Sequence, residues 1–355
     1  MAIRQFIIAL IISLAAAGYA SAWTPLAVED DALVRMPGTQ PSNGVSLEAP
    51  NRCMNCHKGY DPLNDPGTLW TGSMMAQSAR DPIFWATMTV AIQDAIWPIG
   101  NPNATDKCER CHFPHGWLEG RSDPTNASLM TGSDFDGIHC DFCHTAYDPF
   151  FADTYDGTRE SNDWEGYWDE FGNTGPGSGT LAQDEADVTR AEDTTEAAAL
   201  TQMDNRPLFE NERPANTSYD EATSGQFYNS TGAEKRASFA DAGAKHKMLY
   251  SRFHKSRYFC GTCHDVSNPV LANLGASGLP DLNPGATITE QHPAYAYFHV
   301  ERTFSEFMLS DFGRGDGAAT NADFQAQGGA DVTFVNKCQD CHMKDSYAVA
   351  ANKGS

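Results

Sequence analysis

All ten cysteines of this 355-residue chain fall in five copies of one motif, Cys-x-x-Cys-His. At this spacing, two thiols can bond to the two vinyl groups of one porphyrin while the imidazole binds the iron. Because no cysteine is left over, the chain has no thiol for a disulfide. The motif therefore predicts five covalently bound haem c groups, each with its iron.

The motif also predicts the role of each residue in it. The ten thiols that would bind the cofactor are Cys53, Cys56, Cys108, Cys111, Cys140, Cys143, Cys260, Cys263, Cys338 and Cys341. The five imidazoles that would bind iron on the proximal side are His57, His112, His144, His264 and His342. Zinc sites and redox dithiols also use Cys-x-x-Cys, but neither needs a histidine directly after each pair.

Residues 1–22 have the features of a cleaved secretory signal. Arg4 gives a positive start, an apolar run follows from Phe6 to Ala17, and Ala20-Ser21-Ala22 is a small-residue cleavage site. The apolar run is too short to span a bilayer. We therefore expect export to the periplasm or to the extracellular cell surface, with no transmembrane segment after cleavage.

The composition, with 30 glycines and 19 prolines, predicts a mainly α chain with much irregular structure. We expect a multihaem cytochrome c fold in which stacked haems form the core, so that haem binding contributes to folding. After the signal, the motifs divide the chain into three regions. These are a three-haem region at 23–144, a haem-free insertion at 145–244 and a two-haem region at 245–355.

Two helices are predicted from local patterns. Asp81 followed by Pro82 is typical of a helix start, and apolar residues continue at helical spacing up to Trp97. A second apolar stripe predicts a helix from about Pro293 to Leu309. The second and third motifs are separated by only 27 residues, so their haems are expected to be neighbours in space.

The formal charge of −23 excludes nucleic acid as a plausible partner. It favours other redox proteins or cytochromes with basic docking patches, although a negative surface also simply aids solubility. The insertion at 145–244 contains 21 acidic and 6 basic residues. Calcium could use Asp153, Asp156, Asp184, Glu185 and Asp187, but they have no EF-hand register. A solvated acidic surface loop is favoured.

The second axial ligand of each iron decides between electron transfer and substrate binding. Six histidines lie outside the motifs, and five of them are candidate distal ligands: His139, His246, His254, His292 and His299. His139 cannot reach over its own haem but can bind a neighbouring one. His292 and His299 would share a face of the second predicted helix. His115 is then spare, or a ligand to a haem in another subunit.

Three further sequence segments are distinctive: residues 70–76 (WTGSMMA), residues 260–266 (CGTCHDV) and residues 303–310 (TFSEFMLS). With the five motifs, they resemble multihaem c-type cytochromes related to the tetrahaem cytochromes of nitrifying bacteria. In such proteins the segment that corresponds to residues 70–76 often carries a distal histidine where this chain has Met75. The resemblance implies a His/Met haem, an open iron or a ligand supplied from elsewhere. In such proteins the segment that corresponds to residues 303–310 is often followed by a histidine, as Ser-x-His, where this chain has Phe312.

These features predict an exported pentahaem cytochrome that relays electrons through closely spaced, mostly six-coordinate haems, and is not an enzyme. Respiration or extracellular electron transfer would be its setting. One alternative is a multihaem reductase that acts on a small nitrogen or sulfur substrate at one open haem. Another is a homo-oligomer, namely a subunit of a polymeric cytochrome filament.

Overall fold

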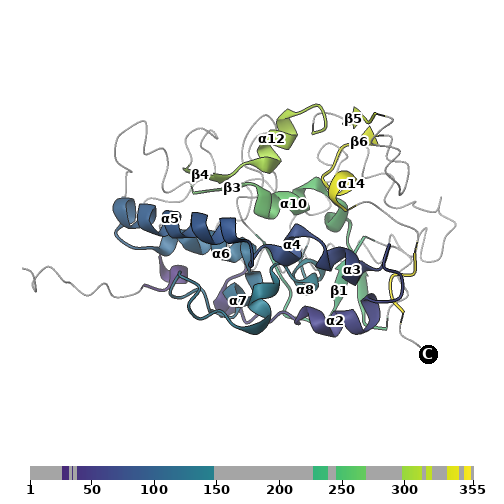
Figure 1. The fold of residues 1–355 in the computed structure, drawn as a ribbon, viewed down its shortest axis with the longest axis horizontal. Coiled ribbons are helices and arrows are strands. Elements are labelled where there is room, and N and C mark those ends of the chain that lie inside the picture. Colours follow the sequence, from purple (N-terminus) through teal and green to yellow (C-terminus); the bar gives the residue numbers. More distant parts are fainter. Residues whose placement is uncertain are drawn as a thin grey trace, which may run out of the picture.

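Short helices account for most of the regular structure, and turns and irregular segments join them (Figure 1). The computed structural model describes residues 26–31, 34, 38–147, 227–238, 245–268, 298–313, 317–321, 334–343 and 348–352. This partly helical, partly irregular chain agrees with the prediction from composition. The expected signal and most of the acidic insertion, with its calcium candidates, lie outside the described residues.

The first half of the described chain contains helices alone. They are the 3₁₀ turns η1 (Val28–Asp30), η2 (Pro41–Asn43), η3 (Asn103–Thr105) and η4 (Gly132–Asp136), and the α-helices α2 (Pro50–His57), α3 (Pro66–Thr71), α4 (Met74–Gln77), α5 (Pro82–Ile99), α6 (Asp106–His112), α7 (Pro114–Leu118) and α8 (Cys140–His144).

The second half adds short strands between its helices. In chain order it contains β1 (Lys235–Ala237), β2 (Met248–Tyr250), η8 (Arg252–Lys255), α10 (Arg257–His264), β3 (Val266–Asn268), β4 (Phe298–Glu301), α12 (Thr303–Leu309), β5 (Ala318–Ala319), β6 (Phe334–Val335) and α14 (Gln339–His342). The strands pair as β1 with β2 in parallel, and as β3 with β4 and β5 with β6 antiparallel. The sequence patterns did not predict these pairs.

Helix α5 confirms the first predicted helix. The Asp81 carboxylate accepts a hydrogen bond from the backbone N–H of Ile83 at 2.8 Å, and Pro82 occupies the first turn. The helix ends at Ile99, where Gly100 adopts a left-handed conformation with φ 77°. Although α5 is the longest described helix, no helix in the described ranges is long and apolar enough to cross a membrane.

The second predicted helix is wrong at residues 298–301, while residues 293–297 lie outside the described residues. Residues 298–301 form strand β4, in which His299 pairs with Ser267 of β3. A new helix begins only at Thr303, whose backbone N–H donates to the Glu301 carboxylate at 2.7 Å. His299 therefore lies in a strand and shares no helical face with His292, which lies outside the described residues. Pairing with a distant strand overrode the local apolar pattern.

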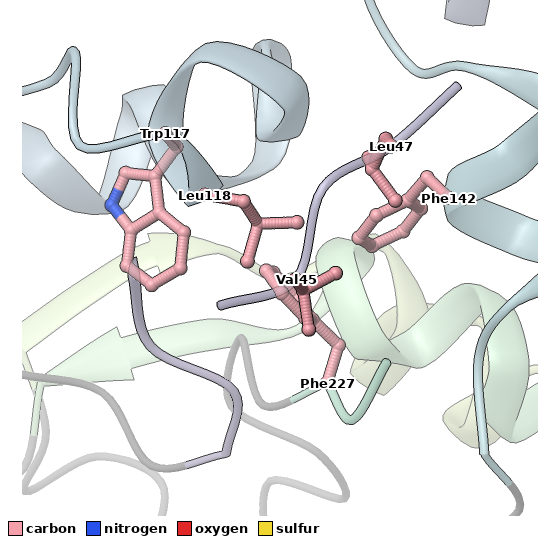
Figure 2. Packing of buried hydrophobic residues seen from close by; sticks show 6 residues of the cluster. All are labelled: Val45, Leu47, Trp117, Leu118, Phe142 and Phe227. Atoms are coloured by element: carbon pink, nitrogen blue, oxygen red, sulfur yellow. The ribbon is translucent and has the colours of Figure 1, made fainter. Parts of the chain in front are cut away.

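Two small apolar clusters lie against the motifs. The first contains Val45, Leu47, Trp117, Leu118, Phe142 and Phe227, which converge from four separate segments (Figure 2). The second contains Ala79, Phe84, Met88, Phe113 and Met130. Cys143 packs on the first cluster and Cys108 on the second. The described core therefore surrounds the second and third motifs.

The segment Trp70–Ala76 docks beside the third motif. The Trp70 indole N–H donates to the Ile138 carbonyl at 2.8 Å, and the Ile138 N–H donates to the Met75 carbonyl at 3.0 Å. Gly137 permits this approach, because a Cβ at its position would lie 2.2 Å from the Met75 carbonyl oxygen. Its φ of 70° is also one that residues with a Cβ rarely adopt.

We predict that Gly137→Ala lowers the free energy of unfolding by at least about 2 kcal/mol, because strain and a backbone clash add together. Denaturant unfolding followed by circular dichroism would measure the change. The matched control is Gly44→Ala, since Gly44 has φ 73° and no atom within 4 Å of an added Cβ. It should cost only about 1 kcal/mol. Equal losses in the two variants would contradict the close approach at Gly137.

Candidate haem sites

Each of the five motifs lies on a short helix whose last residue is the motif histidine. The helices are α2, α6, α8, α10 and α14, which end at His57, His112, His144, His264 and His342. Residues three apart share a helix face, so the two thiols of each motif point to the same side. All ten cysteines are free thiols.

Three of these histidines are oriented by a backbone carbonyl. The Nδ1 of His57 lies 2.8 Å from the Ala350 carbonyl oxygen, that of His112 lies 3.2 Å from Ser78, and that of His144 lies 2.7 Å from Arg236. A carbonyl only accepts, so Nδ1 carries the proton and Nε2 keeps its lone pair. This is the tautomer that binds iron through Nε2.

The C-terminal segment supplies the acceptor for His57. The Asn352 N–H donates to the Cys56 carbonyl at 2.8 Å, and the Tyr60 hydroxyl donates to the Val349 carbonyl at 2.7 Å. The first and last parts of the described chain are therefore joined at the first motif.

His264 has a different acceptor, the carboxylate of Glu301. Its Nδ1 lies 3.4 Å from Glu301 Oε2. The hydrogen bond that His264 donates to the Glu301 carboxylate raises the pKa of His264, against the opposing effect of burial. Burial works to raise the pKa of Glu301, but hydrogen bonds from His264 and Thr303 outweigh it and lower that pKa. Both pKa shifts therefore have the contact between these two side chains as a cause.

Two candidate distal histidines lie opposite motif histidines. The ring centroids of His57 and His246 are 6.4 Å apart, and those of His144 and His254 are 5.9 Å apart with planes inclined by 15°. Metal–imidazole bonds of about 2 Å place two rings on opposite sides of one iron with centroids about 6 Å apart. Both separations match that requirement.

The histidines near the third motif, His144 and His254, are half-buried and have lowered pKa values. Burial lowers the pKa of His144, and it lowers the pKa of His254 to about 3. Neutral imidazole is the form that ligates metals. The Nε2 of His254 lies 2.6 Å from the Cys143 carbonyl. This contact would have to be released for Nε2 to bind iron.

His139 and His115 lie beside each other, with ring centroids 4.7 Å apart. The Nε2 of His139 lies 2.7 Å from the Ser133 carbonyl, and its buried Nδ1 has no hydrogen-bond partner among the described residues. His115 is held by Asp134, whose Oδ1 lies 2.8 Å from His115 Nδ1. At 4.7 Å the two rings are too close to ligate one iron from opposite sides.

The aromatic ring stacked on His112 is Phe84, at 3.9 Å between centroids and 13° between planes. The sequence pattern placed Phe84 only in the apolar stripe of α5 and did not connect it with a motif. Met75, a candidate distal ligand, is half-buried, and its backbone carbonyl accepts a hydrogen bond from the Ile138 N–H. No sequence pattern predicts this stacking, because Phe84 lies on α5 and His112 lies on α6.

Thiols of different motifs contact each other. Cys53 is hydrogen-bonded to Cys140, Cys111 to Cys263, and Cys260 to Cys338. These contacts pair the first motif with the third, the second with the fourth, and the fourth with the fifth. The short spacing of the second and third motifs predicted that these two would be neighbours, but these thiol contacts do not pair them.

The donor set at the motifs fits haem c. Two thiols lie on one helix face, an imidazole keeps its Nε2 free, and at two motifs a second imidazole lies about 6 Å away. Among the described residues, the motifs included, no group of three or more His, Cys, Asp or Glu side chains is placed to hold a metal ion by itself.

Comparison with known families agrees with this chemistry. Residues 52–145, which include the first three motifs, match the family model described as cytochrome c554 and c-prime. The match supports a c-type cytochrome. Covalently bound haem c and electron transfer are the properties that such a cytochrome implies. No curated protein and no solved structure matches the chain.

The Asp134 carboxylate that holds His115 also pairs with Arg121, at 2.6 Å and 2.7 Å. Burial works to raise the pKa of Asp134, but hydrogen bonds from His115 and Arg121 outweigh it and hold the pKa well below its usual range. A lowered folded-state pKa contributes stability above the unfolded pKa of about 3.9, and this stability is lost as the pH falls further.

We predict that Asp134→Asn lowers the free energy of unfolding by about 2–3 kcal/mol at pH 7, and that the difference from wild type shrinks below pH 4. Urea unfolding at several pH values would measure it. Asp136→Asn is the matched control, because Asp136 lies on the same turn and pairs with Arg80 at the surface. Its effect should stay below about 1 kcal/mol. A pH-independent loss for Asp134→Asn would contradict the charge-based explanation.

Proposed function

We propose that the protein is an exported pentahaem c-type cytochrome that relays electrons between redox partners. The observation that carries this proposal is that the five motif helices form one connected set. Thiol contacts link the first motif to the third, the second to the fourth and the fourth to the fifth. His254, which precedes α10, contacts the Cys143 carbonyl and so links the third motif to the fourth.

A connected set of sites is what an electron relay requires. The chemistry of electron transfer is supplied by haem c when it is bound. The chain's own part is to attach each group by two thiols, to orient an imidazole through its Nδ1, and to exclude water. The ten thiols and five motif histidines would perform these roles.

The distal ligands proposed from geometry are His246 opposite His57 and His254 opposite His144. When haem is bound, a second imidazole would be a further ligand to its iron and would favour electron transfer over substrate binding. The other candidates, His139, His292, His299 and Met75, remain proposals for the other irons, with His115 as a spare or inter-subunit ligand.

The acidic charge of the chain supports partners with basic docking patches, because opposite charges steer association. Export is proposed from residues 1–22 and from the attachment of haem c outside the cytoplasmic membrane. A multihaem reductase of a small nitrogen or sulfur substrate is the second candidate, and it would need one iron without a distal imidazole.

Mass spectrometry of the purified protein tests the number of haems. We expect the mature polypeptide plus five haem masses. Replacing both cysteines of one motif by alanine should remove one haem mass, irrespective of which motif is changed. A wild-type protein that carries fewer than five haems would contradict the proposal.

Spin-state measurements test the ligand roles. We predict that His246→Ala and His254→Ala each convert one of five haems from low-spin to high-spin iron, because each opens one axial position. Electron paramagnetic resonance would detect the change. His115→Ala is the control and should leave the spectrum unchanged, since Asp134 holds that imidazole. An unchanged spectrum in either test variant would refute its assignment, and a high-spin fraction in the wild type would favour the reductase.

A further inference from the structure

Glu301 is placed to do two things with its two carboxylate oxygens. Oε1 accepts from the backbone N–H groups of Arg302 at 3.0 Å and Thr303 at 2.7 Å, and from the Thr303 hydroxyl at 2.5 Å. It thereby begins helix α12. Oε2 is buried from water and lies 3.4 Å from the Nδ1 of His264. One oxygen is therefore reserved for the motif histidine.

Three contacts fix Glu301 beside the fourth motif. In the β3–β4 pair, Val266 is opposite Glu301, which brings the carboxylate close to the end of α10. Arg302 pairs with the buried Asp265 at 3.7 Å. The Phe304 ring packs on Gly261, where an added Cβ would lie 3.0 Å from it. The carboxylate is thus held by the fold and does not depend on a flexible surface side chain.

The fourth motif differs in this respect from the first three. The Nδ1 groups of His57, His112 and His144 face neutral carbonyls, whereas the Nδ1 of His264 faces an anionic carboxylate at 3.4 Å. A carboxylate pulls the proton more strongly and makes the imidazole a more basic, more electron-rich ligand. Such a ligand stabilises ferric over ferrous iron and lowers the reduction potential.

We infer that Glu301 is a positioning residue that polarises His264 and lowers the reduction potential of the haem at the fourth motif. This inference rests on the proposed binding of haem at that motif. The fourth motif contacts both the second and the fifth through its two thiols. Glu301 therefore acts at a junction of the proposed relay.

The test is a spectroelectrochemical titration of the full holoprotein with Glu301→Gln. Glutamine keeps an oxygen for the N–H groups that begin α12, but its amide nitrogen cannot accept the His264 proton. One of the five midpoint potentials should rise. We expect at least a tenfold change in that haem's reduction equilibrium, which is about 59 mV for a one-electron couple. The near-infrared charge-transfer band of the same haem should move with it.

The matched control is Glu306→Gln, which removes the same charge from an exposed position in the first turn of α12. It should leave all five potentials within error. Equal shifts in the two variants, or a shift of all five haems together, would overturn the inference and indicate a general charge effect. An unchanged titration of Glu301→Gln would also overturn it. Loss of a haem mass from the wild type would instead count against the proposed function, so the two failures are distinguishable.

Discussion

The hydrogen bond from the Nδ1 of a motif histidine to an acceptor elsewhere in the fold is the interaction on which these sites depend. It selects the tautomer that leaves Nε2 free for a metal, and it fixes the plane of the imidazole. The acceptors come from far along the chain: Arg236 for His144 and Ala350 for His57. Each such bond therefore ties a motif helix to a distant segment, so that ligand orientation and tertiary structure form together.

Because these hydrogen bonds tie the motif helices to distant segments, the fold needs little regular secondary structure to position them. The described apolar clusters are small and lie against the second and third motifs. A buried arginine, Arg110, packs over the rings of both Trp117 and Phe227, 4.4 Å and 4.1 Å from their centroids. Such contacts hold the motif helices in position. Among the described residues they do so without a continuous sheet or a long helix bundle. In the proposed function, porphyrin faces would supply the remaining apolar surface.

Local signals predicted part of the fold and failed where distant pairing decided it. Asp81 and Pro82 were sufficient to place the start of α5, because capping depends on neighbouring residues alone. The stripe that ends at Leu309 predicted one helix, yet β4 forms there because β3 offers it a partner. Stacking of Phe84 on His112 was likewise invisible in the sequence, because the two residues are on different helices.

The sequence by itself determined five pairs of thiols, each followed by an imidazole, at a spacing that any short helix presents on one face. That information is local, so it can be recognised without knowledge of the fold. Only the tertiary structure decided which acceptor each histidine meets, which motifs lie together, and that His246 and His254 face His57 and His144. Those relations join residues far apart in the chain, and their energies depend on packing that no short pattern encodes.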